Sequence, residues 1–328
     1  MKLLLTNAGS YPRIGDTKEL QQLRRTIAAW ERKQAGEADL RTAEDQMVKR
    51  ALADQNEAGL DLVTDGLIRW YDPISHLAGK LAGVHINGLL RFFDTNFYFR
   101  QPVVQGEVKA KNGLVVSEYE FAAAHSAQPV KPVLTGPYTL ARHSIAEHAP
   151  YKQLEPLKRA YADALGQEIE KLAAAGAEVI QIDEPAILKH PADFPLLQRG
   201  VLQLNKHKGK AKLCLHVYFG DARPLLDRLL QLPIDILGLD FTYNPKLVER
   251  IVTNGSPKPL ALGLVDGRNT RLEDVAELAH QIDRVLIQVK GGYCHLMPSC
   301  GLEYLPRDRA QAKLKLLGQV RALVKGAR

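Results

Sequence analysis

Short apolar runs recur along the chain, and most of them end at a polar residue or a glycine. Longer stretches with helical spacing lie between them; in 154–175, for example, apolar residues recur every three or four positions. Regular alternation of strands and helices is typical of a parallel α/β fold. The predicted strands are 2–6, 60–64, 130–134, 179–182, 213–217, 236–239, 260–265 and an eighth region that begins at 285–289 and continues to Met297.

Eight strand–helix alternations predict an α/β fold of the closed (β/α)8 type, the TIM barrel. An open doubly wound sheet is the alternative, but the first strand–helix turn lacks a Gly-x-Gly-x-x-Gly phosphate loop. We expect the whole chain, 1–328, to form one domain. Residues 68–128 are too long for one strand–helix unit and are rich in aromatic residues at 91–100. We therefore expect an insertion after the second strand, folded as a lid or packed as a peripheral hairpin.

The composition excludes several classes of protein. The net charge is +7, but the lysines and arginines are scattered, whereas nucleic-acid binding favours a clustered basic stripe. The charge therefore indicates a basic surface or attraction for an anionic substrate. No apolar run is long enough to span a membrane, and the N-terminus does not resemble a signal peptide, so we expect a cytoplasmic protein without membrane or nucleic-acid partners. Three cysteines do not predict a disulfide framework.

Polar residues at the ends of the predicted strands are the candidates for chemistry, because active sites of (β/α)8 barrels lie at the carboxyl ends of the strands. Asp65-Gly66 and Asp266-Gly267 also suit simple turns. Asp183 and Glu184 are adjacent carboxylates, whose repulsion a simple turn would not require. The full set is Ser10, Asp65, Asp183, Glu184, His216, Asp240, Asp266 and the loop around Cys300.

Three of these residues are typical zinc ligands. His216, Asp240 and Cys300 follow different strands, so the barrel would direct them toward a common axis. Cys214 points to the same side of its strand as His216, so it either reaches the metal or fills the core. Cys294 and His295 are weaker candidates. Zinc with an open position can deprotonate a substrate thiol, which predicts alkyl transfer to sulfur, although zinc-assisted hydrolysis stays open.

At these residues the sequence resembles the cobalamin-independent methionine synthase family. The motifs are Ala8-Gly9-Ser10-Tyr11-Pro12-Arg13, 129–137 ending in Thr-Gly-Pro, Ile180-Gln181-Ile182-Asp183-Glu184-Pro185-Ala186 and Pro298-Ser299-Cys300-Gly301-Leu302. The resemblance implies a (β/α)8 barrel that transfers a methyl group to zinc-bound homocysteine. The chain is one barrel long and looks like the single-domain core form. Motifs that look more like the family's non-catalytic N-terminal barrel are Trp70-Tyr71-Asp72, 94–98 and Gly267-Arg268-Asn269.

The resemblance also implies roles for single residues. His216 and Cys300 match zinc ligands, and Asp240 falls where the family has a ligand glutamate. The family's other ligand cysteine falls at Tyr218, so Cys214 or the substrate thiol would complete the set. Asp183 matches the carboxylate that holds the homocysteine amino group. The rest of the expected substrate-binding set consists of Gly9, Ser10, Glu184 and Asp65.

Departures from the family pattern concern the methyl donor. Family residues that contact folate or homocysteine are replaced by His143, Lys189 and Leu67, and the expected proton donor is replaced by Arg268. Arginine cannot supply a proton near neutral pH, whereas a folate donor needs one as its methyl group leaves. The expected donor is therefore a methyl-corrinoid, free or on a partner protein, with 5-methyltetrahydrofolate as the alternative. Two other classes stay open: a metal-free folate or corrinoid binder, and a decarboxylase of the related tetrapyrrole type.

Overall fold

A parallel sheet forms the centre of the molecule, seen in a computed structural model that describes residues 1–326. Seven strands follow the order β1-β10-β9-β8-β7-β6-β4, and all neighbouring pairs are parallel. Their bounds are β1 (Lys2–Leu5), β4 (Val133–Thr135), β6 (Val179–Asp183), β7 (Lys212–Val217), β8 (Ile236–Asp240), β9 (Leu260–Val265) and β10 (Tyr293–Pro298).

A short eighth segment joins the two edges of this sheet. Leu62 forms an isolated parallel bridge with Thr6, next to β1, and Val63 forms one with Val130, just before β4. Eight parallel segments therefore surround one axis, which confirms the predicted barrel. The predicted second strand, 60–64, is reduced to these two bridges.

The predicted start of the eighth strand at 285–289 is wrong. Val285 and Leu286 belong to helix α10 (Val275–Leu286), and the strand begins only at Tyr293. Side chains of Leu278, Ile282 and Val285 form the buried face of α10, so helical spacing prevailed over the local β-branched run. Asp274 caps this helix by accepting a hydrogen bond from Glu277 N–H.

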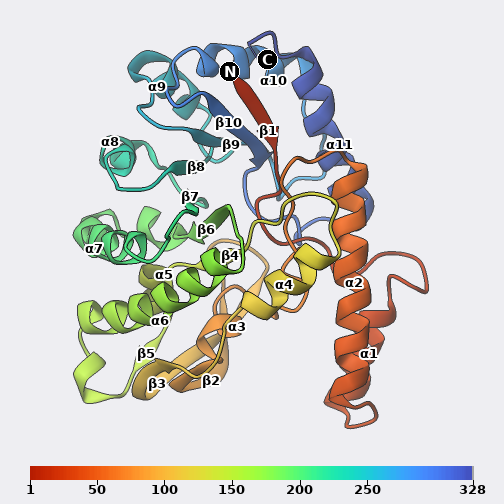
Figure 1. Ribbon diagram of the computed structural model, residues 1–328, viewed down its shortest axis with the longest axis vertical. Coiled ribbons are helices and arrows are strands. Elements are labelled where there is room, and N and C mark those ends of the chain that lie inside the picture. The colour runs from red at the N-terminus through yellow and green to blue at the C-terminus, as the bar shows by residue number, and fades with distance from the viewer. Residues whose placement is uncertain (327–328) are drawn as a thin grey trace.

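Helices surround the ring of strands on its outer side (Figure 1). One of the two longest, α6 (Leu154–Ala174), buries the predicted apolar stripe and is followed by Gly176, which has a positive φ. None of the helices in residues 1–326 is long and apolar enough to cross a membrane. The other helices of the barrel are α1 (Gln22–Glu31), α2 (Glu37–Glu57), α5 (Pro137–Arg142), α7 (Phe194–Asn205), α8 (Leu226–Leu230), α9 (Lys246–Asn254) and α11 (Arg307–Leu323), with short 3-10 turns at Ala149–Tyr151, Pro185–Leu188, Pro191–Asp193 and Arg223–Leu225.

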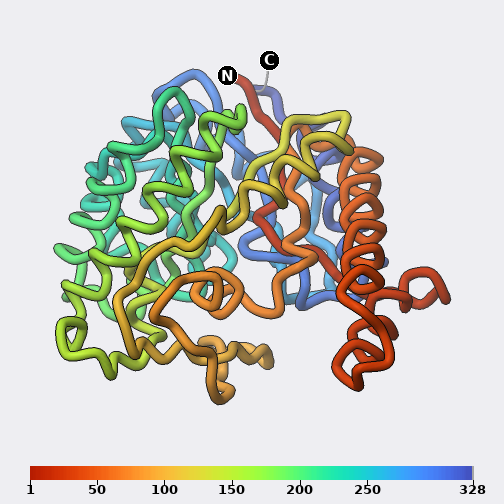
Figure 2. Tube along the Cα trace, turned by 60° about the horizontal axis from the view of Figure 1, so that its bottom comes forward, coloured from red at the N-terminus to blue at the C-terminus, as the bar shows by residue number. Residues whose placement is uncertain are grey.

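Most of the segment 68–128 forms a separate layer at one end of the barrel. This layer contains α3 (Ser75–Ala78) and the antiparallel pair β2 (Leu81–Arg91) and β3 (Tyr98–Ala110), to which β5 (Ile145–Ala146) adds. Helix α4 (Val116–Ala124) packs against α2 and α6 in the outer ring of helices (Figure 1). The β2–β3 hairpin lies at the opposite end of the molecule from the chain's N-terminus (Figure 2). Because β1 runs from the N-terminus toward the hairpin, this layer covers the carboxyl ends of the strands.

Candidate active site

Neighbouring strands bring Asp183 and His216 together at the carboxyl end of the barrel. Asp183 ends β6 and is in register with His216 on β7, which is in register with Gly238 on β8. His216 Nδ1 lies 3.6 Å from Asp183 Oδ1. A Cβ at Gly238 would lie 3.0 Å from His216 Cδ2, so the glycine leaves room for the imidazole ring. The predicted strand-end geometry thus holds for this pair.

A buried chain of hydrogen bonds runs from Lys131 through Gln181 to the Asp183 carboxylate. The Gln181 amide donates to Asp183 Oδ1 (2.8 Å) and to the carbonyl of Ala8 (2.5 Å). Gln181 Oε1 accepts from Lys131 Nζ, which also donates to the carbonyl of Asn7. Lys131 is 1% exposed, and burial lowers its pKa to about 8. Sequence reasoning missed Lys131 and Gln181, although a lysine within an apolar strand was a usable signal.

His216 has one nitrogen without a hydrogen-bond partner. Nδ1 faces Asp183 and lies 3.4 Å from the Gln181 amide nitrogen, whereas Nε2 is buried and unpaired. The 3.6 Å separation of Nδ1 from Asp183 is too long for a hydrogen bond, so Asp183 contacts His216 by charge only. The unpaired Nε2 is the nitrogen that could bind a metal, and this role stays a prediction.

Asp240 ends β8, and Cys300 follows the end of β10. Asp240 Oδ1 accepts three hydrogen bonds from Thr242 and Tyr243, while Oδ2 has one long contact, 3.4 Å, with Phe219 N–H. Burial raises the pKa of Asp240, and its hydrogen bonds with Tyr243 and Thr242 lower it. Burial also raises the pKa of Cys300 well above its usual range, and the Asp240 carboxylate adds to this effect. Asp240 Oδ2 is therefore the carboxylate oxygen that is least occupied by hydrogen bonds.

Cys214 lies one layer deeper than His216. It packs in an apolar cluster inside the barrel, and burial raises the pKa of its thiol to about 12. The other buried members are Ala8, Leu62, Val179, Ile236, Ala261 and Met297. Within residues 1–326, no three His, Cys, Asp or Glu side chains are placed closely enough to hold one metal ion. The predicted set of His216, Asp240, Cys300 and Cys214 is therefore not gathered into a complete coordination sphere.

The predicted substrate-binding residues occupy different environments. Gly9 lies in a loop whose carbonyl accepts from Asn7 and Thr64 side chains. Asp65 accepts from Leu67 N–H, and burial raises its pKa to about 6. Glu184 accepts three hydrogen bonds from Tyr138 and Thr139 at the N-terminus of α5, so its carboxylate caps this helix.

Ser10 lines a small pocket between the loops and the hairpin. The pocket is formed by the loops that follow β1, the 62–63 segment and β10, and by Phe97 of the hairpin loop. Glu303 lines the same pocket, and its Oε2 is buried without a partner. Sequence reasoning missed Glu303, although it follows Cys300 by only three residues. Its position depends on how the loop after β10 folds, which no local pattern predicts.

Aromatic residues form the rim between the hairpin and the barrel. Phe92 and Phe93 of the hairpin loop pack against Phe219, which follows β7. The Arg268 guanidinium lies over the Phe219 ring at 5.0 Å, and Nη1 is 3.5 Å from Asp94. Arg268 therefore connects the loop after β9 to the hairpin and lies outside the Asp183–His216 pair.

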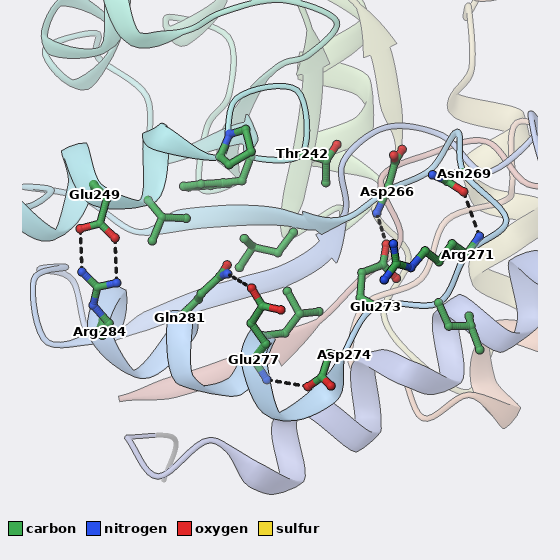
Figure 3. A pocket seen from close by; sticks show the side chains of 16 residues that line it. Thr242, Glu249, Asp266, Asn269, Arg271, Glu273, Asp274, Glu277, Gln281 and Arg284 are labelled. Carbon is green, nitrogen blue, oxygen red and sulfur yellow. Dashed lines mark hydrogen bonds and ion pairs between the residues drawn. The ribbon is translucent and has the colours of Figure 1, made fainter.

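A larger groove of about 440 Å³ lies outside the barrel, lined by α9, α10 and the adjoining loops (Figure 3). Its charged groups satisfy one another: Arg284 makes two contacts with Glu249, and the Gln281 amide donates to Glu277. Glu273 accepts from Asp266 N–H and from Lys313 Nζ. The groove therefore supports the loop after β9, and most of its charged groups are paired, although Glu273 Oε2 is buried without a partner.

Known proteins match this chain along most of its length. Residues 3–322 match the family described as "Cobalamin-independent synthase, Catalytic domain". Methionine synthase of Sulfolobus acidocaldarius is 32% identical over 94% of this chain and 88% of its own length. Methionine synthase of Saccharolobus islandicus strain L.S.2.15 is 34% identical over 94% of this chain and 91% of its own length.

Solved structures match the fold. A B12-independent methionine synthase from Shewanella sp. W3-18-1, in complex with selenomethionine, superposes with a TM-score of 0.80 over 99% of this chain and 98% of its own, at 23% identity. A putative vitamin-B12 independent methionine synthase from Listeria monocytogenes gives a TM-score of 0.76 at 19% identity over 98% of this chain and 99% of its own. The family match and the curated relatives together show that the chain belongs to the cobalamin-independent methionine synthases and corresponds to the catalytic barrel of these enzymes.

Proposed function

We propose that this enzyme transfers a methyl group to the sulfur of homocysteine and forms methionine. The family match supports the reaction, because the chain covers 88% of a methionine synthase to which it is similar. The observation that carries the proposal within the site is the Asp183–His216 pair with its unpaired Nε2. The family gives no support to the tetrapyrrole decarboxylase alternative.

In this proposal zinc binding draws together His216, Cys300 and Asp240, which do not yet form a metal site within the described residues. The unpaired His216 Nε2, the Cys300 thiol and the less occupied Asp240 Oδ2 are the donors that zinc prefers. Bound zinc would lower the pKa of a substrate thiol, so that its thiolate is available as a nucleophile near neutral pH. Cys214 lies in an apolar layer, so we assign the remaining position to the substrate sulfur. Asp183 orients His216 through Nδ1.

We assign 5-methyltetrahydrofolate as the methyl donor. The family is described as cobalamin-independent, which gives no support to a corrinoid-protein partner. Because arginine side chains do not give up a proton near neutral pH, the proton that the folate requires as its methyl group leaves would come from water or another acid. We assign Arg268 to binding negative charge on the donor. The hairpin loop at Phe92, Phe93 and Asp94, which contacts Phe219 and Arg268, would act as a lid that excludes water from the donor.

The test is methionine formation from homocysteine by the purified chain. The expected result is turnover with 5-methyltetrahydrofolate and none when the donor is omitted, with about one zinc per chain. Turnover with methylcobalamin alone would overturn the folate assignment. A purified chain that holds no zinc after incubation with zinc, and forms no methionine, would instead support the metal-free binding protein.

A further inference from the structure

An ion pair lies buried between α2 and α11, outside the ring of strands. Arg307 Nη2 lies 2.7 Å from Asp54 Oδ2, and the two side chains are only 4% and 1% exposed. Asp54 is on α2, and Arg307 begins α11, directly after the loop that carries Cys300. Arg50 also contacts Asp54, at 3.2 Å, but its side chain is exposed. The Arg307–Asp54 pair is therefore the part of this cluster that is removed from solvent.

A buried ion pair often contributes little to the stability of a fold. Burial removes hydration from both charges, and this loss offsets much of their attraction, so apolar side chains of similar size are often as stabilising. The geometry of this pair adds to the cost, because both Asp54 oxygens and the Nε and Nη2 atoms of Arg307 lack a directed hydrogen bond. Stability alone therefore does not account for the Arg307–Asp54 pair.

The remaining nitrogen of the guanidinium holds the loop that follows β1. Arg307 Nη1 donates to the carbonyl of Pro12 at 2.8 Å, and Cζ lies 5.1 Å from the centre of the Tyr11 ring. Nη1 also lies 3.3 Å from the Met47 sulfur on α2. Tyr11 itself is fully buried. Arg307 thus contacts two consecutive residues of the 8–13 loop and fixes them against α2.

The 8–13 loop is bonded in turn to its neighbours around the small pocket. The Ser10 carbonyl accepts from Leu302 N–H at 2.9 Å, and Tyr11 N–H donates to the Gly66 carbonyl at 2.8 Å. Ser10 and Arg13 both line the pocket, on either side of the residues that Arg307 contacts. A shift of this loop would therefore move two walls of the pocket together.

We propose that Arg307 and Asp54 are positioning residues that fix the 8–13 loop for substrate binding at the carboxyl end of the barrel. Asp54 holds the guanidinium by its charge, and the guanidinium holds the loop through the Pro12 carbonyl and the Tyr11 ring. Neither Arg307 nor Asp54 lines the pocket, so both act through the loop. This inference rests on the proposed function, which makes the loop part of the homocysteine site.

The test replaces the buried pair by apolar side chains. Arg307→Met and Asp54→Leu are made singly and together in the full chain, and the urea unfolding midpoint and the KM for homocysteine are measured for each variant. Each single change leaves one buried charge without its buried partner and should lower the midpoint, whereas the double variant should recover most of this loss. Its KM should nevertheless stay raised by about tenfold, with a smaller change in kcat, because the Pro12 carbonyl has lost its donor.

Lys315 and Glu57 provide the matched control. They form an ion pair of 2.7 Å between the same two helices, α11 and α2, but both side chains are exposed. Lys315→Met combined with Glu57→Gln should leave the unfolding midpoint and the KM nearly unchanged. Asp54→Asn keeps the shape of the buried side chain and removes its charge, so it should raise the KM as well, and it replaces the double variant if that does not fold.

Amide hydrogen exchange gives a second measurement that does not depend on the reaction. The Tyr11 N–H, which is bonded to the Gly66 carbonyl, should exchange faster in the Arg307→Met, Asp54→Leu double variant than in the unaltered chain and in the control.

Two results would overturn the inference. A KM that returns to the unaltered value in the double variant would mean that the pair acts on stability alone, and unchanged exchange at Tyr11 would mean that it does not hold the loop. The proposed function fails separately. Faster exchange at Tyr11 in a chain that forms no methionine, even when unaltered, would support the positioning of the loop and contradict only the reaction.

Discussion

Lys131 Nζ lies 2.5 Å from Gln181 Oε1 in the interior of the barrel, and this contact fixes which end of the Gln181 amide faces Asp183. Since the oxygen accepts from the lysine, the amide nitrogen must point toward Asp183 and the Ala8 carbonyl. A buried cation thus controls the orientation of the carboxylate that faces His216. Gln181, which lies two residues before Asp183 on β6, is thus the residue that transmits this effect from Lys131.

Gln181→Glu tests this positioning without emptying the barrel. The variant keeps an oxygen for Lys131 but loses the donor to Asp183 and places two carboxylates side by side. We expect a raised KM for homocysteine with the thermal unfolding midpoint nearly retained, because the Lys131 contact persists. Lys131→Met, which leaves the Asn7 carbonyl and Gln181 Oε1 unpaired, should destabilise the fold by about 1–3 kcal/mol. Steady-state kinetics and urea unfolding of both variants separate the two effects; an unaltered KM in Gln181→Glu would contradict the positioning role.

The cysteines should respond differently to substitution by serine. Cys300→Ser should lower bound zinc to less than about a tenth of an equivalent, because zinc prefers thiolate to hydroxyl ligands. Cys214→Ser should keep its zinc, since Cys214 packs in the apolar layer. Cys294, which is buried next to Met1, provides the control. Metal analysis after dialysis measures all three, and loss of zinc from Cys214→Ser would identify Cys214 as the missing ligand.

Glu118 should make the fold sensitive to acid. Burial alone would raise the pKa of Glu118, but His76 and Lys80 outweigh it and lower the pKa from 4.5 to about 2. Its stabilising effect is therefore complete above about pH 4.5 and is lost as the pH falls toward 2. We expect Glu118→Gln to lower the free energy of unfolding by about 3 kcal/mol at pH 7. Between pH 4.5 and 2 the unaltered chain should lose stability more steeply than the variant, which chemical denaturation at each pH would measure. Parallel pH profiles would contradict this role.

Arg268 should affect the methyl donor and not homocysteine. Arg268→Ala removes a cation from the rim of the site, so we expect the KM for the donor to rise about tenfold while the KM for homocysteine stays constant. Asp94→Asn removes the ion pair with the hairpin but keeps the guanidinium. If both variants raise the donor KM equally, Arg268 acts by holding the hairpin in place and does not bind the donor.

The sequence predicted the barrel because each strand ends at a recognisable polar residue or glycine. It placed Asp183, His216 and Asp240 at the correct strand ends, since parallel neighbours in register bring such residues together. It failed for 285–289, where the apolar residues belong to a helix face. The sequence did not point to Glu303 because its position in the pocket depends on loops that are distant in sequence. Such tertiary relationships leave no periodic pattern.

The closure of the barrel at 62–63 has a consequence for motion. Few backbone hydrogen bonds cross this junction, and Leu5 N–H is satisfied partly by the Asp61 side chain, which a contact from Arg321 holds in place. Amide hydrogen exchange should therefore be faster at Val63 and Lys131 than along β6 and β7. An opening at this junction would widen the space between the loops that carry Ser10 and Leu67, and the strands that position Asp183, His216 and Asp240 would stay paired.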